Sequence, residues 1–499
     1  CSQENDFADA TVSLAADIPA DADFLPIGTK DTPFAGVFEG NGHEISGLAP
    51  DCDYAGLFAF TDGAEIYDLT VSGDVFAFNY AGGIVAYAVE TVIENCVGNA
   101  CVYADYYTGG IAGYMESGEI RSCSTTSYPA IIGYEAYTGG ILGAGKADII
   151  SCTNNAYIEG IRNTGGIAGS SSGNISYCLN AFSIEASGVN CGGIAGYTNG
   201  TVSYSRNKSA VAGKGKTGGI VGVASDAVIS ECLNEGAVNA EGNYAGGIAG
   251  YVTGGKLADC LSKANVTNSA DFVAGIFGYS SASATERCLF TASVTSRTST
   301  GAAIGAVSNG TVADCYYNSA SSSKAFVTGT AKTGAAGISA SDIAKASSYT
   351  NWDFNKVWAI NEIHASHPLL INVGYHSLTV TDDVEATCTS DGYIKEFCTL
   401  CHETITTVFP ATGHDYKIVS VKYASCTEPG YTDKVCTICN FAVSEDVPAL
   451  PHPDENADEI CDDCGKDLKV KQPTEKKSFF QKIIDFFTGI FDWLKNLFK

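Results

Sequence analysis

A short glycine phrase recurs through most of the chain and constrains its fold more than any other feature. It reads YTGGIAGY at 107–114 and returns as AGGIAGY at 245–251. Aligned on the glycine before the large aliphatic residue, successive copies are 26 to 30 residues apart. A fixed period of this size indicates a solenoid, in which each unit buries its apolar face by stacking on its neighbours. The aligned residues are Gly56, Gly83, Gly110, Gly140, Gly166, Gly193, Gly219, Gly247, Gly275 and Ala303.

The text between the phrases is typical of strands and turns. Its runs are short, rich in Val, Ile, Thr and Tyr, and broken by Gly, Asn and Ser. Between Phe7 and Val327 no stretch keeps a 3.6-residue apolar period long enough for a helix. We therefore predict an all-β chain in which residues 1–372 form a right-handed parallel β-helix of about ten coils, each with three short strands. Coils about 4.8 Å apart would make a rod about 45–50 Å long.

A column of cysteines has the same period. It could indicate disulfides or a row of metal ligands, or else stacked small apolar residues, because free Cys behaves as a small hydrophobe. Ser205 fills one place in the column and would leave a disulfide partner unpaired, so we predict packed free thiols. In several coils an asparagine follows two residues later, as at Asn154, Asn180, Asn207 and Asn234. The cysteines are Cys96, Cys123, Cys152, Cys178, Cys232, Cys260, Cys288 and Cys315.

Aromatic residues recur at two further places in the repeat. Exposed rings could stack on sugars, whereas buried rings would pack between coils, which is the ordinary arrangement in a solenoid. Three residues before the reference glycine stand Tyr80, Tyr107, Tyr137, Tyr244 and Phe272, and four residues after it stand Phe60, Tyr87, Tyr114, Tyr197, Tyr251 and Tyr279.

The repeat resembles the GLUG-motif repeats of bacterial surface proteins, which also occur beside immunoglobulin A1 protease domains. The variants of GGIAG, the lead-in PFAGVFEGNGHEISGL at 33–48 and the closing NWDFNKVWAI at 351–360 carry the likeness, which covers about 370 residues. The resemblance implies a secreted or surface-exposed β-helix, often an adhesin stalk, and it implies no reaction.

Charge and residue types argue against two function classes. Acidic residues number 56 against 28 basic ones, and a net charge of −28 repels a phosphate backbone, so we expect no nucleic-acid partner. Enzymes on β-helices need clustered carboxylates with Arg or Lys on one face. Here five Arg do not gather and the acidic residues look scattered, while HEISG at 43–47 and HETIT at 402–406 lack the second His of a zinc protease. We predict no catalytic residues and no cofactor beyond structural zinc. A polysaccharide lyase or hydrolase is the alternative, and three charged side chains in one groove would favour it.

After Asn372 a second period begins. The unit His-x11-Cys-x9-Cys-x2-Cys repeats after 38 residues, in a first module at 373–416 and a second at 417–468 that includes a shortened third unit. Cys-x2-Cys is typical of a tetrahedral zinc knuckle, and another Cys and a His would complete Cys₃His. The disulfides of an exported protein are the rival interpretation.

The sequence leaves open which histidine closes which site. With His414 the first site is Cys388, Cys398, Cys401 and His414, and the second is Cys426, Cys436, Cys439 and His452; His376 could replace His414. Cys461 and Cys464 would form part of a third knuckle. These units resemble tandem modules near the C-terminus of Firmicutes surface proteins, through ATGHDY at 411–416 and CTEPGY at 426–431. That resemblance implies a small β-rich spacer without defined activity.

The chain ends in a polar linker at 469–478 and an apolar-faced segment at 479–499. Its spacing predicts an amphipathic helix, and the charges of Lys482, Asp485, Asp492 and Lys495 argue against a membrane span. It would lie on a membrane surface or pack on a partner helix. Cys1 would be either a lipidated start or a cut end. We predict a non-enzymatic, secreted or cell-surface bacterial adhesin or display protein, from a Firmicute, that binds a host glycan or surface protein.

Overall fold

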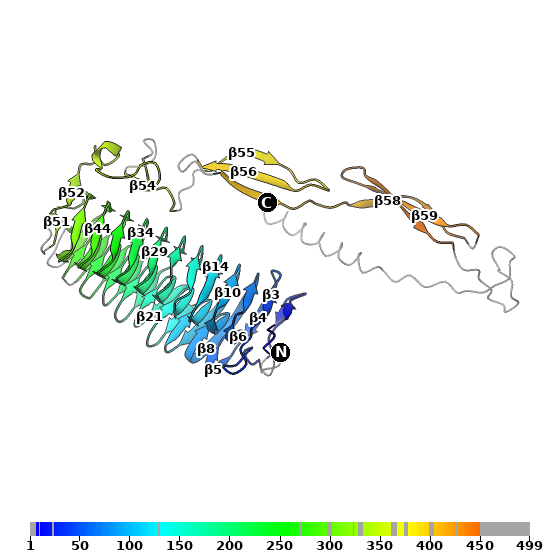
Figure 1. Ribbon diagram of the computed structural model, residues 1–499, viewed down its shortest axis with the longest axis horizontal. Helices are drawn as coiled ribbons and strands as arrows, with labels where there is room; N and C mark the ends of the chain where they lie inside the picture. The colour runs from blue at the N-terminus through cyan, green and yellow to red at the C-terminus, as the bar shows by residue number, and fades with distance from the viewer. Residues whose placement is uncertain are drawn as a thin grey trace. The chain divides into compact units, whose positions relative to one another are not determined.

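The structure is a computed structural model (Figure 1) that describes residues 6–8, 10–21, 24–127, 130–269, 271–296, 302–322, 324–327, 333–360, 367–373, 378–398, 404–425 and 427–449. They belong to two compact units: 1–377 with 398–403, and 378–397 with 404–499. The predicted linker at 469–478 and helix at 479–499 lie outside the described residues. The module boundaries within 373–468 stay predictions.

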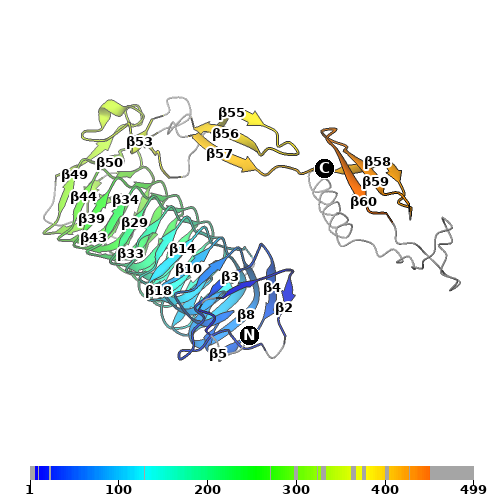
Figure 2. The same cartoon turned by 45° about the vertical axis from the view of Figure 1, so that its right-hand side comes forward.

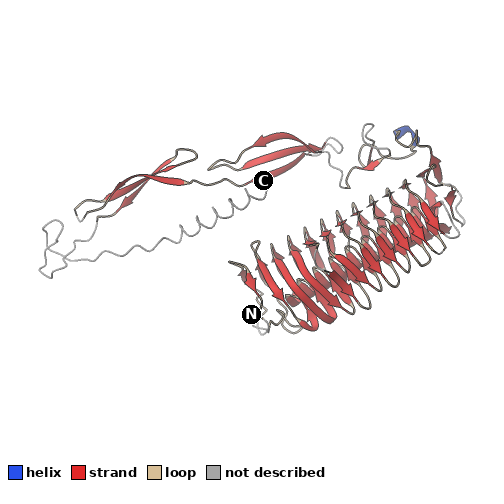
Figure 3. Ribbon diagram, turned by 180° about the vertical axis from the view of Figure 1, so that it is seen from behind, coloured by secondary structure: helices blue, strands red, loops and turns tan. Residues whose placement is uncertain are grey.

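The first unit is a parallel β-helix, which confirms the predicted fold class (Figures 1 and 3). Each coil pairs in parallel register with the next, so Ile149 lies beside Ile175 and Ile175 beside Val202. One face is a twelve-stranded sheet. It has more strands than the chain has glycine phrases, because its outermost coils lack the phrase. Its strands are β1 (Thr11–Ser13), β3 (Val37–Glu39), β7 (Glu65–Tyr67), β10 (Thr91–Glu94), β14 (Gly118–Arg121), β19 (Asp148–Ile150), β24 (Ile175–Ser176), β29 (Thr201–Ser203), β34 (Val228–Ser230), β39 (Lys256–Ala258), β44 (Ala284–Glu286) and β49 (Thr311–Ala313).

A second face is a ten-stranded sheet that follows the glycine phrase in each coil (Figure 2). Its strands are β6 (Phe58–Asp62), β9 (Val85–Val89), β13 (Ala112–Met115), β18 (Leu142–Gly145), β23 (Ala168–Ser171), β28 (Ala195–Thr198), β33 (Val221–Ser225), β38 (Ala249–Thr253), β43 (Phe277–Ser281) and β48 (Ala306–Ser308).

The third face is built from shorter strands, up to three in each coil, and in the third coil they merge into the long β8. They are β2 (Ile18–Pro19), β4 (Glu44–Leu48), β5 (Asp51–Ala55), β8 (Thr70–Gly82), β11 (Val97–Ala104), β12 (Tyr107–Gly109), β15 (Ser124–Thr125), β16 (Ala130–Gly133), β17 (Thr138–Gly139), β20 (Thr153–Asn154), β21 (Tyr157–Gly160), β22 (Thr164–Gly165), β25 (Leu179–Asn180), β26 (Ile184–Ala186), β27 (Cys191–Gly192), β30 (Arg206–Asn207), β31 (Val211–Gly213), β32 (Thr217–Gly218), β35 (Leu233–Asn234), β36 (Val238–Ala240), β37 (Ala245–Gly246), β40 (Leu261–Ser262), β41 (Val266–Asn268), β42 (Val273–Ala274), β45 (Leu289–Phe290), β46 (Val294–Ser296), β50 (Cys315–Asn318) and β52 (Ala335–Ile338).

The recurring glycine is required by crowding inside the coil. A Cβ at Gly166 would lie 2.2 Å from the carbonyl oxygen of Gly193 in the next coil and 2.5 Å from Cγ of Asn180. Asn180 is fully buried, and its amide accepts a hydrogen bond from Asn154 and donates one to Asn207, each at 2.8 Å. In four central coils this column of glycines packs against a hydrogen-bonded column of asparagines, Asn154, Asn180, Asn207 and Asn234.

The cysteine column is buried, and its cysteines are free, as predicted. The Cys96 thiol donates to the carbonyl of Glu94 at 3.1 Å, and the Ser205 hydroxyl repeats this contact with Ser203 at 2.8 Å. Each coil turns just before this column at a residue with left-handed backbone, such as Tyr177 at φ 56°. Burial raises the pKa of thiols such as Cys178 well above the usual value.

The closing segment of the first unit, which includes Trp352 and Trp358, packs against a row of leucines from three successive coils: Leu233, Leu261 and Leu289. Trp358 in β53 (Trp358–Ala359) is fully buried, and its ring lies 4.2 Å from that of Trp352. β53 pairs with β54 (Leu369–Leu370), β47 (Ala302–Ile304) pairs with β51 (Lys324–Phe326), and the 3₁₀ helix η1 spans Ala346–Ser348. Among the described residues, no helix has the length and apolar character needed to cross a membrane.

The second unit contains two small antiparallel sheets, as the predicted β-rich modules require. One has β55 (Leu378–Val384), β56 (Gly392–Cys398) and β57 (Thr404–Phe409), and the other has β58 (Tyr416–Lys422), β59 (Gly430–Cys436) and β60 (Ala442–Val447).

Candidate functional site

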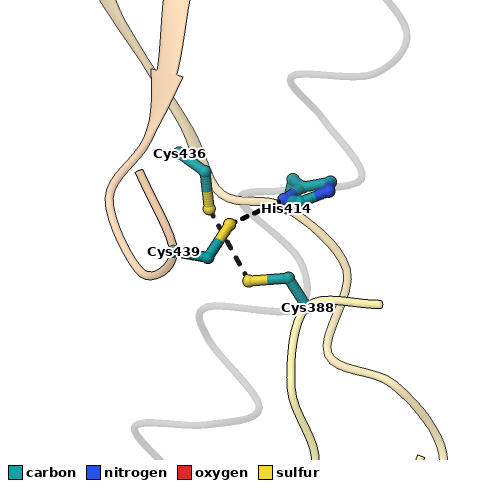
Figure 4. Close-up of side chains that lie close together, drawn as sticks. All are labelled: Cys388, His414, Cys436 and Cys439. Atoms are coloured by element: carbon teal, nitrogen blue, oxygen red, sulfur yellow. Dashed lines mark hydrogen bonds between the residues drawn. The ribbon is translucent and has the colours of Figure 1, made fainter. Parts of the chain in front are cut away.

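Four of the predicted metal ligands converge in the second unit (Figure 4). The ligand atoms of Cys388, His414, Cys436 and Cys439 all lie within 4.8 Å of one another. The sulfurs of Cys388 and Cys436 are 3.7 Å apart, and the Cys439 sulfur is 3.3 Å from Nδ1 of His414. Three thiols and one imidazole form the Cys₃His donor set of a structural zinc site.

A tight turn after β59 positions the Cys-x2-Cys pair. The N–H of Cys436 donates to the carbonyl of Phe441 at 2.9 Å, and the N–H of Asn440 donates to the carbonyl of Cys436 at 3.0 Å. Asn440 has a φ of 60°, a left-handed conformation that Asn tolerates better than most residues. This turn brings both thiols to one side of the chain.

Backbone hydrogen bonds hold the other two ligands nearby. The N–H of Thr412 donates to the carbonyl of Thr387 at 2.9 Å, which joins the segment before His414 to the segment before Cys388. The His414 ring also stacks on Phe441, with centroids 5.1 Å apart, and that contact fixes its orientation.

The two buried thiols, Cys388 and Cys436, have very different pKa values because their surroundings differ. Burial, followed by hydrogen bonding to Cys439 and Cys436, raises the pKa of Cys388 to about 11. Burial also raises the pKa of Cys436, but hydrogen bonds from the N–H of Cys439 and from His414 outweigh it and lower that pKa to about 6. Of these two buried thiols, Cys436 is the one that more readily becomes the thiolate needed for metal binding.

The observed ligand set differs from the one inferred from the sequence. Cys388 and His414 lie in one site in the structure, as predicted. The Cys-x2-Cys pair beside them is Cys436 and Cys439 of the second module, not Cys398 and Cys401. Units identical in spacing cannot show whether a site closes within one unit or between two. The side chain of Cys398, together with His376, Cys401, Cys426, His452, Cys461 and Cys464, lies outside the described residues.

The two aromatic columns of the solenoid are mainly packing elements. Tyr54, Tyr80, Tyr107 and Tyr137 stack nearly parallel, with centroids 4.6 to 5.0 Å apart, so each ring covers the face of its neighbour. The rings are half-buried. The structure therefore supports the cross-coil packing interpretation for this column.

A different aromatic surface is exposed, and the sequence analysis missed it. We call it the aromatic face, and it consists of Phe76, Phe78, Tyr103, Tyr106 and Tyr134. Phe78 is 58% exposed and Tyr134 is 52% exposed. Phe76 stacks on Tyr103 of the next coil at 4.8 Å, and Phe78 meets Tyr106 edge-on at 6.1 Å. The signal was the alternation of Phe76, Phe78 and Tyr80 along β8, which places all three on one side of a strand.

The aromatic face lies in an acidic environment. No Lys or Arg occurs between Asp31 and Ile120. Asp51 pairs in register with Phe76, and the N–H of Asp105 donates to the carbonyl of Phe78 at 3.3 Å. Such a surface favours neutral or cationic ligands and disfavours anionic ones.

A separate groove corrects the expectation that acidic residues are scattered. Glu159, Glu185 and Glu241 line it together with Lys214, over β21, β26, β31 and β36, in a volume of about 310 Å³. Glu159 and Glu185 are register partners in adjacent coils. The clustering arises because equivalent outward positions of successive coils lie side by side, an effect that the linear spacing conceals.

Comparisons with known proteins add little to the fold. No protein-family model and no curated protein matches the chain. Among solved structures, a Bacteroides ovatus protein described as a putative immunoglobulin A1 protease matches with 18% identity and a TM-score of 0.28, over 73% of this chain and 86% of that one. Neither the GLUG resemblance nor the Firmicutes module resemblance is confirmed by these comparisons.

Proposed function

We propose that this chain is a non-enzymatic adhesin or display protein on a bacterial surface, and that its β-helix binds a host glycan through the aromatic face. The observation that carries the proposal is the exposure of Phe78 and Tyr134 within the aromatic face, in which Phe76 contacts Tyr103 and Phe78 contacts Tyr106. Exposed apolar patches of this kind mark interaction sites, and aromatic residues are enriched at the energetic centres of interfaces.

The chemistry of the surroundings narrows the ligand. Aromatic rings offer flat apolar surface to the C–H face of a sugar, and the exposed carboxylates of Asp51 and Asp74 can accept hydrogen bonds from sugar hydroxyls. The absence of Lys and Arg between Asp31 and Ile120 leaves sulfate or sialate groups without a counter-charge there. The proposed ligand is therefore a neutral or amino-bearing glycan.

A glycan array probed with the purified full chain tests this proposal. We expect binding to neutral or amino-bearing glycans and weaker or absent binding to their sulfated and sialylated counterparts. Binding confined to anionic glycans would refute the charge argument. Binding to none, alongside capture of a protein ligand on the same face, would assign the surface to a host protein.

The acidic groove favours one second candidate, a polysaccharide-degrading enzyme. Glycoside cleavage requires a pair of carboxyl groups on either side of the scissile bond, and Glu159 and Glu185 place two carboxylates on adjacent coils in this groove. Incubating the chain with polysaccharides and measuring new reducing ends tests this. Activity in wild type that is lost in Glu159→Gln and Glu185→Gln would establish the enzyme, and no activity would leave the binding role.

The remaining parts of the chain complete the proposal. The cysteine-rich modules would serve as a metal-stabilised spacer, and the segment at 479–499 would associate with a membrane surface or a partner helix. Liposome flotation of the full chain and of a variant lacking 479–499 tests the membrane role. Equal flotation of the two would exclude it.

A further inference from the structure

We propose that Cys388, His414, Cys436 and Cys439 form one structural zinc site shared between consecutive repeat units. Cys388 and His414 lie in the first module, at 373–416, whereas the Cys-x2-Cys pair lies in the second, at 417–468. The site would therefore join two consecutive repeat units of the cysteine-rich region, instead of stabilising each repeat unit separately. This inference is independent of the glycan-binding proposal.

The distances fit a metal tetrahedron. With Zn–S at about 2.3 Å and Zn–N at about 2.0–2.1 Å, two sulfurs should lie about 3.8 Å apart, and sulfur and nitrogen about 3.6 Å apart. Two of the six distances come close to these values, at 3.7 Å between Cys388 and Cys436 and 3.3 Å between Cys439 and His414, and all six lie within 4.8 Å. A disulfide needs about 2.05 Å between sulfurs, so the arrangement disagrees with a bond between Cys388 and Cys436.

The donor set selects the class of ion and its role. Thiolates and imidazole suit zinc, whereas Mg²⁺ and Ca²⁺ prefer oxygen ligands. Four protein ligands close the coordination sphere and leave no position for a reactive water, so the site is structural. Cys388 and Cys436 are both buried, which shields the site from solvent on that side.

Hydrogen bonds around the site link residues close to the ligands, both within the first module and between the two modules. The hydrogen bond from Thr412 to Thr387 ties the His414 segment to the Cys388 loop. On the other side, the N–H of Thr437 donates to the carbonyl of Asp415 at 2.8 Å, and its hydroxyl donates to Oδ2 of Asp415 at 2.9 Å. The Thr412–Thr387 bond lies within the first module, whereas the two Thr437–Asp415 bonds cross to the second, so residues close to the ligands are held together across the module boundary.

The shared site and a site closed within each unit predict different metal counts. In a shared site, Cys388→Ala and Cys436→Ala remove ligands of the same ion. In sites closed within units, Cys388 and Cys436 belong to different ions. The experiment measures zinc per chain by elemental analysis on the full-length protein for both single variants and the double variant. Cys52→Ala is the matched control, because Cys52 is an exposed free cysteine of the solenoid.

We expect each single variant to lose about one zinc per chain and the double variant to lose no more than either single variant. His414→Ala should give the same loss, and Cys52→Ala should leave the zinc content unchanged. A double variant that loses two zinc ions would overturn the shared site in favour of sites closed within units. Wild-type protein that contains no zinc, with these cysteines oxidised, would overturn the metal site itself. Because the solenoid has its own core, its circular dichroism reports whether a variant has misfolded as a whole.

Discussion

The asparagine column makes a strong and quantitative prediction about the stability of the solenoid. Asn180 is fully buried and makes three side-chain hydrogen bonds at 2.8 Å, with Asn154, Asn207 and the carbonyl of Phe182. Asn180→Ala removes all three. Each such bond contributes about 1 kcal/mol net, and a buried group left without a partner costs about 1–3 kcal/mol, so we expect a loss of about 4–6 kcal/mol.

Guanidinium denaturation followed by circular dichroism measures this loss. Because long repeat arrays can depart from two-state unfolding, amide hydrogen exchange of the coils that carry Asn154 and Asn207 should accompany it. Asn199→Ala is the matched control, because Asn199 is exposed and its substitution should change stability by less than about 0.5 kcal/mol. If Asn180→Ala destabilises no more than Asn199→Ala, the reasoning about the column is refuted.

Three further predictions concern the solenoid. Gly166→Ala should destabilise it by several-fold more than a surface change, because the new Cβ would lie 2.2 Å from the Gly193 carbonyl; denaturation midpoints measure this, and an unchanged midpoint would contradict it. Alkylation followed by mass spectrometry should label exposed Cys52 in the native protein and Cys178 only after unfolding; rapid native labelling of Cys178 would show that the column is open. Burial, then the charge of Lys263, lowers the pKa of His367 from 6.5 to about 4. The unfolded chain therefore binds the extra proton first, and stability should fall by about 3 kcal/mol as pH falls from 6.5 to 4. Denaturation at pH 6.5 and pH 4 should show a smaller loss of stability for His367→Gln than for the wild type. An identical loss in both proteins would exclude His367 as the cause of the pH dependence.

Much of the solenoid could be predicted because its information repeats. A period in Gly166 and its equivalents is visible in the sequence, and so is the in-phase column of Cys178. The packing of that glycine against Asn180 was not predicted, because it depends on which positions meet inside a coil.

The sites were harder to predict, because sequence spacing does not identify spatial partners. The Cys-x2-Cys signal indicated a group of side chains that could hold a metal, and Cys436 and Cys439 lie in such a group; yet Cys388 lies beside Cys436 of the second module and not beside Cys398 and Cys401 as predicted. Likewise Glu159 and Glu185 are 26 residues apart in sequence and register partners in space. The aromatic face shares this origin, since Phe76 meets Tyr103 only through coil stacking.

The most direct test of glycan binding by the aromatic face is a calorimetric titration with a neutral glycan that the chain binds on the glycan array. We expect Phe78→Ala combined with Tyr134→Ala to bind this glycan at least about tenfold more weakly than the wild type does, which corresponds to about 1.4 kcal/mol. Tyr177→Ala combined with Tyr204→Ala removes a stacked pair elsewhere on the solenoid, in which Tyr177 is exposed and Tyr204 is half-buried, with centroids 4.7 Å apart; this variant should leave binding unchanged. Equal affinity of wild type and the Phe78/Tyr134 variant would contradict the claim that the aromatic face is the binding surface.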